Sequence, residues 1–163
     1  MIKKNMPMFQ AVLENHQLLP LLPRFDIKLG FGERSVQEVC RLNGVNTDFF
    51  LEIANAYLNE DYIPQTDLSL FSLSTMVAYL TSTHEYYLEI ALPKMENKIH
   101  RLLDGSSLSD KERGLVSDFF DDYRKEFLDH ISREEKRVLP YILELEKQSL
   151  EAVSYTHLTL PTN

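Results

Sequence analysis

The sequence has little cysteine, little glycine and no long apolar run. Cys40 is the only cysteine among 163 residues. This excludes an intramolecular disulfide and any zinc or iron–sulfur site built from several cysteines of one chain. The sequence has no stretch of about 18 apolar residues and no signal-peptide pattern, which predicts a cytoplasmic protein with no membrane partner. Only five glycines interrupt several long periodic segments, and this favours an all-α fold.

The chain also lacks an excess of positive charge. Its net charge is −8, which argues against non-specific binding to nucleic acid, because such binding depends on clustered Lys and Arg. We find no nucleophile–base set and no phosphate-binding loop. The segment Leu29-Gly30-Phe31-Gly32 has two glycines and no following Lys-Ser/Thr, which is more typical of a turn. The sequence therefore predicts no catalytic residue, and enzymatic activity stays an open question.

Residues 1–58 predict a small N-terminal module of three helices. The first spans about residues 6–20 and is predicted to end at Pro20 and Pro23. The second begins at Ser35, which forms an S-x-x-E capping box with Glu38. The third runs from a cap at Thr47 to about Leu58. A polar, acidic linker follows at residues 59–71.

Residues 72–152 predict a long antiparallel helix hairpin. The first helix runs from Ser72 or Ser74 to about Leu103, with a kink at Pro93. The second is capped by Ser109 and bent near its end by Pro140. The second helix is predicted to turn the following residues inward: Val116, Phe119, Phe120, Tyr123, Phe127, His130, Ile131, Glu134, Val138, Tyr141, Ile142 and Leu145. Since two helices cover such wide stripes poorly, we expect this hairpin to be half of a four-helix bundle, with something else packed on it.

A candidate metal site lies on this hairpin. His130 and Glu134 are four residues apart, so they lie one turn apart on the same face of a helix. His84 occupies the apolar seam of the preceding helix, at nearly the same height above the turn. A carboxylate in an apolar seam is costly to bury unless a cation offsets its charge. Two imidazoles and a carboxylate suit iron, zinc or manganese. The alternative is an ordinary polar pair on a helix surface.

The segment His130-x-x-x-Glu134-Glu135-x-x-x-Leu139-Pro140, with His84 upstream, resembles the first half of a hemerythrin-like (HHE) cation-binding domain. The whole chain is similar to hemerythrin-domain proteins related to the iron–sulfur cluster repair (RIC) family, in which a small helical domain precedes the bundle. The resemblance implies a di-iron centre with His84 and His130 as ligands and Glu134 as the bridge. It also implies further ligands on two helices that this sequence does not contain. Repair proteins of this family carry a Cys-Cys pair near residues 28–32, where this chain has none.

Residues 153–163 break every pattern before them. One back-translation of this segment resembles the transposon end and adapter of tagmentation sequencing libraries. We therefore interpret residues 153–163 as a non-native tail, with the native sequence ending near Ala152. The alternative is an ordinary short strand or coil. On this interpretation the metal site is incomplete or empty in one chain. Two chains could pair as a makeshift bundle, a homo-oligomer that the sequence alone does not favour.

These features support a hemerythrin-like, non-haem iron-binding protein. The resemblance implies a role in nitric oxide or oxygen stress, or in the repair of iron centres. One alternative is a helix-turn-helix DNA-binding regulator formed by the helices near residues 35–43 and 47–58. The second of these carries Asp48 and Glu52 but no Lys or Arg, which suits a recognition helix poorly. The other alternative is an interaction bundle that binds no metal. The role of Cys40 is interpreted as that of a small buried apolar residue.

Overall fold

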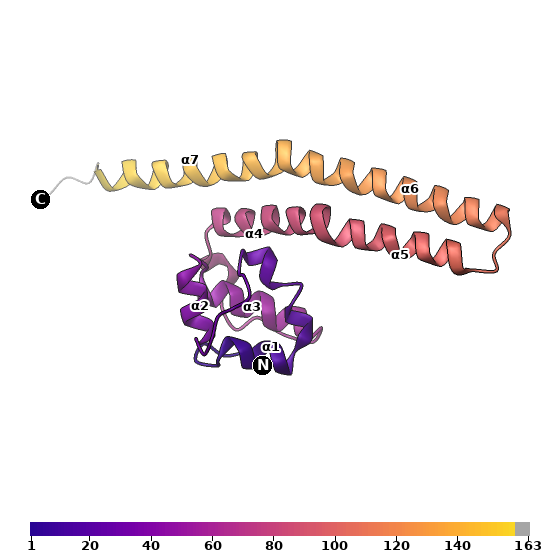
Figure 1. The fold of residues 1–163 in the computed structure, drawn as a ribbon. Helices are drawn as coiled ribbons and strands as arrows, with labels where there is room; N and C mark the ends of the chain where they lie inside the picture. Colours follow the sequence, from indigo (N-terminus) through magenta and orange to yellow (C-terminus); the bar gives the residue numbers. More distant parts are fainter. Residues whose placement is uncertain (159–163) are drawn as a thin grey trace, which may run out of the picture. The chain divides into compact units, whose positions relative to one another are not determined.

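The computed structural model describes residues 1–158, with side chains up to residue 151. Within this range the protein is all-α: helices are joined by turns and loops, and one isolated β-bridge joins Pro7 to Ser35. The predicted fold class is therefore confirmed, with short N-terminal helices followed by a long antiparallel helix pair (Figure 1). The chain forms two compact units, unit 1 at Met1–Thr83 and unit 2 from His84 onward. This division falls inside helix α4, whereas the sequence predicted the second domain to begin at residue 72.

Unit 1 contains the short helices. These are α1 (Met8–Glu14), α2 (Val36–Leu42) and α3 (Thr47–Leu58), with 3-10 turns η1 (His16–Leu18), η2 (Leu22–Phe25) and η3 (Leu68–Leu70), and the first part of α4 (Leu73–Tyr86). The predicted capping box is present: the Ser35 hydroxyl accepts from the Glu38 backbone N–H, and the Glu38 carboxylate accepts from the Ser35 N–H. Gly44 ends this region with a φ of 70°, which glycine adopts without strain.

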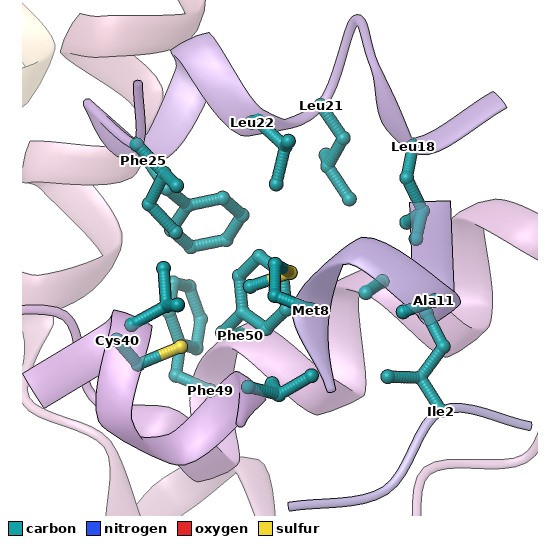
Figure 2. Close-up of a cluster of buried hydrophobic side chains, with 14 of the residues drawn as sticks. Ile2, Met8, Ala11, Leu18, Leu21, Leu22, Phe25, Cys40, Phe49 and Phe50 are labelled. Carbon is teal, nitrogen blue, oxygen red and sulfur yellow. The ribbon is translucent and has the colours of Figure 1, made fainter. Parts of the chain in front are cut away.

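The core of unit 1 is a dense apolar cluster (Figure 2). Phe25 lies edge-on to Phe49 and Phe50, with ring centroids 6.1 Å and 5.1 Å away. Cys40 is buried in the same cluster. Rings in this arrangement bring the positive edge of one against the negative face of the next. Unit 1 therefore has a hydrophobic core of its own.

A buried carboxylate fixes the segment after α3. Glu52 accepts hydrogen bonds from the Tyr62 hydroxyl at 2.9 Å and from the backbone N–H groups of Gln65 and Thr66 at 3.1 Å and 2.8 Å. Burial acts to raise the pKa of the Glu52 carboxyl, but hydrogen bonds from Thr66, Tyr62 and Gln65 outweigh it and hold the pKa below its usual value. The region predicted as a polar linker is thus tied to α3.

Two predicted helix boundaries in unit 1 are wrong. The first helix ends at Glu14 and not at Pro20, because Asn15 leaves helical geometry at φ −138° and its side-chain amide donates to the Ala11 carbonyl. Asparagine competes in this way with the helical hydrogen bond. The cap of α3 is Asn46, whose side chain accepts from the N–H groups of Asp48 and Phe49, and Thr47 is the first helical residue.

Unit 2 is a helix hairpin. It contains the end of α4, the π-helical turn η4 (Tyr87–Ala91), α5 (Leu92–Gly105), α6 (Asp110–Arg133), the π-helical turn η5 (Glu134–Val138) and α7 (Leu139–Leu158). Ser109 and Glu112 form the predicted capping box. The Arg113 guanidinium donates to the carbonyl oxygens of Leu103, Ser106 and Leu108. One side chain thereby closes the turn between the two helices, which run antiparallel in Figure 1.

The predicted proline kinks take the form of two π-helical turns. Pro93 and Pro140 have no N–H to donate to the carbonyls of Glu89 and Lys136, and their rings crowd those carbonyls. The chain widens instead: the Leu92 N–H bonds to the Tyr87 carbonyl. The corresponding bond runs from the Leu139 N–H to the Glu134 carbonyl. Single π-turns of this kind are frequent at functional sites.

The two long helices leave much of their apolar surface exposed. Six residues that were predicted to point inward have exposed side chains: Phe119, Tyr123, His130, Val138, Tyr141 and Leu145, of which Phe119 is 73% accessible. Among the described side chains of α6 and α7, those of Phe120, Ile131 and Leu139 are buried. The prediction failed because one partner helix can cover only one side of a wide stripe.

No helix among the described residues is long and apolar enough to cross a membrane. Helix α7 continues to Leu158, so the backbone of the first residues of the predicted non-native tail is helical. The rest of that tail, residues 159–163, lies outside the described residues.

Glu52→Gln should loosen the segment that follows α3. The amide retains the shape but loses the charge that the hydrogen bonds stabilise, and we expect local stability to fall by about 1–3 kcal/mol. Hydrogen exchange of peptides from residues 47–70 at neutral pH measures this.

The same hydrogen-exchange experiment, repeated at lower pH, tests the charge of Glu52. Because the pKa of Glu52 is lowered on folding, its contribution is present above the pKa of the unfolded state and is lost as the pH falls through the folded value. Protection should therefore decline below about pH 4.5 in the wild type. The decline should be weaker in Glu52→Gln. Glu33→Gln, at an exposed carboxylate, is the control, and equal loss of protection in both variants would contradict this account.

Candidate metal centre

The hairpin brings the predicted ligands together around one carboxylate. Glu134 Oε2 lies 3.2 Å from Nε2 of His84, and Glu134 Oε1 lies 3.2 Å from Nε2 of His130. Each oxygen of this carboxylate therefore lies beside a different imidazole. The three residues come from α4, the end of α6 and the first position of η5. The prediction that His84 reaches the height of His130 and Glu134 agrees with these distances.

His84 also contacts the neighbouring carboxylate, Glu135. Its Nδ1 lies 2.6 Å from Glu135 Oε1, within hydrogen-bonding distance. The sequence predicts that Glu135 faces solvent, whereas its side chain is half-buried and 34% exposed in the structure. Glu134 and Glu135 are the first two residues of the π-turn, and both carboxylates lie close to the same imidazole ring.

The burial of the two histidines differs. The side chain of His84 is 10% exposed, whereas that of His130 is 56% exposed. Glu134 and Glu135 are half-buried. His84 thus lies inside the hairpin, and His130 lies at its open surface. Tyr87 and Phe127 pack edge-on beside this region, with ring centroids 5.9 Å apart.

The hydrogen-bond pattern constrains the His84 ring. A carboxylate has no proton to give, so Nδ1 carries the proton and donates it to Glu135. In the neutral ring, the Nε2 lone pair then faces Glu134 Oε2, and two acceptors oppose each other at 3.2 Å. Such an arrangement requires a proton on Nε2 or a cation between the two atoms. Carboxylate–histidine pairs that fix a tautomer in this way support metal-binding histidines in many proteins.

The distances fit ligands that share an ion. Two ligands about 2.1 Å from one metal, at tetrahedral or octahedral angles, lie about 3.0–3.4 Å from each other. Both nitrogen–oxygen separations at Glu134 fall in this range. They also lie at the upper end of the range for N–H···O hydrogen bonds, about 2.7–3.2 Å, so the distances suit either interaction.

Two ligands per ion are fewer than a stable site uses. In the part of the chain whose side chains are described, no group of three or more His, Cys, Asp or Glu residues is arranged around one point. The donor types therefore fit a transition metal, but further ligands are needed. Cys40, which the sequence analysis interpreted as a small buried apolar residue, lies in unit 1, where burial raises the pKa of its thiol to about 12.

Comparisons with known proteins add no relative. No protein-family model, no curated protein and no solved structure matches the chain. The fold is therefore described from the structure alone, as that of a small all-helical protein with a long antiparallel hairpin.

Glu135→Ala should destabilise unit 2. The substitution leaves the Nδ1–H donor of the buried His84 ring without its acceptor, which costs about 1–3 kcal/mol. Urea unfolding followed by helical circular dichroism measures the change in the free energy of unfolding. Glu85→Ala removes an exposed carboxylate beside His84 and should have an effect of less than about 0.5 kcal/mol. The Nδ1 contact would be unimportant if both variants unfolded at the same urea concentration.

Proposed function

We propose that unit 2 is a metal-binding module that takes divalent transition-metal ions at Glu134, with His84 and His130 as nitrogen ligands. The observation that supports this most strongly is the position of one carboxylate between two imidazoles, one at each oxygen. Imidazole and carboxylate together suit iron, zinc or manganese.

Iron is the ion that we favour. The H-x-x-x-E-E segment and the upstream His84 resemble a hemerythrin-like domain, in which the corresponding residues hold two irons and the glutamate bridges them. Each oxygen of Glu134 lies beside a different imidazole, which agrees with a bridging role for this carboxylate. On this proposal the protein is a non-haem iron protein of the stress-response or iron-centre repair type. Within it, Glu135 would hold the His84 ring with Nε2 directed at the ion.

The alternative functions receive less support. In a helix-turn-helix regulator, α3 would be the recognition helix, but it carries no Lys or Arg, and its Asp48 pairs with Lys4 at 2.7 Å. A phosphate-binding surface needs unpaired cations. A metal-free interaction bundle is consistent with the exposed stripes of α6 and α7, and the cluster would then serve only as ion pairs between the two arms of the hairpin.

Metal titration tests the proposal directly. Cobalt(II) added to the purified chain should develop visible absorption bands from nitrogen and oxygen ligands, and anaerobic iron(II) should compete for the same site. Glu134→Ala removes the carboxylate that touches both imidazoles, so we expect affinity to fall at least tenfold, the change that follows from about 1.4 kcal/mol. His130→Ala should have a similar effect.

His100→Ala provides the matched control. His100 is an exposed histidine on α5 of the same hairpin, outside the cluster. It should leave cobalt binding unchanged, and circular dichroism should show equal helix content in all variants. Binding that survives both Glu134→Ala and His130→Ala would exclude this site.

A thiol-dependent repair step at Cys40 is not part of the proposal. Its side chain is fully buried, and burial raises the pKa of the thiol to about 12, so little thiolate exists at neutral pH. We expect a disulfide reagent such as DTNB to label native protein at least a hundredfold more slowly than urea-unfolded protein, because labelling requires opening of the core. Equal rates in the two states would show that Cys40 is accessible and would reopen a redox role.

A further inference from the structure

Five of the exposed apolar residues of unit 2 hold the same position relative to the seam between the two long helices. Each comes three positions after a residue of the buried or half-buried seam: Met95 after Leu92, Leu102 after Ile99, Phe119 after Val116, Tyr123 after Phe120, and Leu145 after Ile142. Three residues correspond to a rotation of about 60° around the helix, in the same sense each time. In two antiparallel helices, side chains rotated by the same angle and in the same sense away from the line of contact lie on the same side of the helix pair. The five residues therefore form one open face of the hairpin.

Two of the three proposed metal ligands, His130 and Glu134, belong to this open face. His130 comes three positions after Phe127, and Glu134 comes three positions after Ile131, so both hold the same position relative to the seam as the apolar residues. Along the helix they lie between Phe119 and Tyr123 on one side and Tyr141 and Leu145 on the other. The open face is thus an apolar stripe with a histidine and a carboxylate at its centre.

The area of the open face is that of an interface. Val138 and Tyr141 precede Leu145 by seven and four residues, so they lie on the same face of the helix as Leu145. With these two residues counted, the exposed fractions amount to roughly 700 Å² of side-chain surface, taking about 200 Å² for a fully exposed large side chain. A stable complex of standard size buries about 800 Å² on each partner. Monomeric proteins rarely expose a contiguous apolar patch this large without a function for it.

We infer that a second copy of this chain packs its own open face on this one, so that two hairpins form a four-helix bundle. A two-fold dimer uses the same patch on both chains. The centre of such an interface would hold Glu134, a carboxylate that needs a cation when it is desolvated. The second copy carries a histidine at the equivalent position, which an unrelated partner has no reason to supply.

This arrangement also completes the ligand set. One chain offers His84, His130 and Glu134, with two ligands for each ion. Two chains offer twice that number around one shared centre, enough for three or more ligands for each of two ions. The inference rests on the proposed function for the ligand count, but the packing of the open faces does not require metal. The two claims can therefore fail separately.

Light scattering coupled to size-exclusion chromatography tests the inference on the full chain, in EDTA and in cobalt(II). Wild-type protein should have twice the 19.0 kDa mass of one chain in both conditions. Leu145→Glu places a charge on the open face and should raise the dimer dissociation constant about thirtyfold or more. Phe119→Glu should do the same from the other side of the ligands.

Leu143→Glu is the matched control. Leu143 is 40% exposed, close to the 43% of Leu145, and lies two residues away on α7. It comes four positions after the buried Leu139, which rotates it to the opposite side of the seam. It should leave the dimer intact, and all three variants should retain the wild-type helix content.

The outcomes separate the two claims. A dimer that dissociates in Leu145→Glu but not in Leu143→Glu supports the inference, whether or not cobalt binds. Absence of cobalt binding by that dimer would overturn the proposed metal function alone. A wild-type monomer at micromolar concentration in both conditions would overturn the inference, as would a dimer equally sensitive to Leu143→Glu and Leu145→Glu. Cobalt binding by a monomer would leave the metal function standing and exclude the second copy as the source of ligands.

Discussion

The arrangement of unit 2 centres on the contacts that Glu134 and Glu135 make with His84. These contacts join the two arms of the hairpin at a polar point within an otherwise apolar seam. A histidine that is mostly buried needs partners for both ring nitrogens, and two consecutive carboxylates supply them. Both glutamates belong to the π-turn at Glu134–Val138. The proline at 140 that forces this turn thereby contributes to the site without touching it.

The principal architecture could be predicted from local patterns. The capping boxes at Ser35 and Ser109 fix where two helices begin, and both are present. The apolar periodicity on either side of the turn near residue 105 is enough to predict an antiparallel hairpin. It also brings His84 to the height of Glu134, because helical rise is constant. These features depend on neighbours a few residues apart, which the sequence displays directly.

The features that escaped prediction depend on longer-range geometry. A proline in a helical pattern predicts a disturbance but not its form, so the π-turns and the role of Glu135 were missed. An apolar stripe predicts burial but not by which partner, so Phe119 and Tyr141 were placed in a core although they lie on an open surface. The first helix ends at Glu14 because the side chain of Asn15 competes with the backbone for the Ala11 carbonyl. The sequence analysis placed the end at Pro20, because prolines commonly end a helix. The signal for Glu135 was the pair of adjacent glutamates just before a proline.

The two units differ in how they are stabilised. Unit 1 has a closed aromatic and aliphatic core and a buried carboxylate that secures the following segment. Unit 2 has a thin seam, a turn closed by Arg113 and a charged cluster beside a broad apolar face. The apolar core of unit 2 is small for its number of ordered residues. An ion or a second chain that binds the folded form should therefore raise the free energy of unfolding of unit 2.

X-ray absorption spectroscopy of the metal-loaded chain tests the central claim most directly. The account predicts nitrogen and oxygen ligands near 2.1 Å, with the outer-shell scattering of imidazole, and loss of that scattering in Glu134→Ala and His130→Ala. A spectrum of a hydrated ion, or an imidazole signal that persists unchanged in both variants, would contradict it.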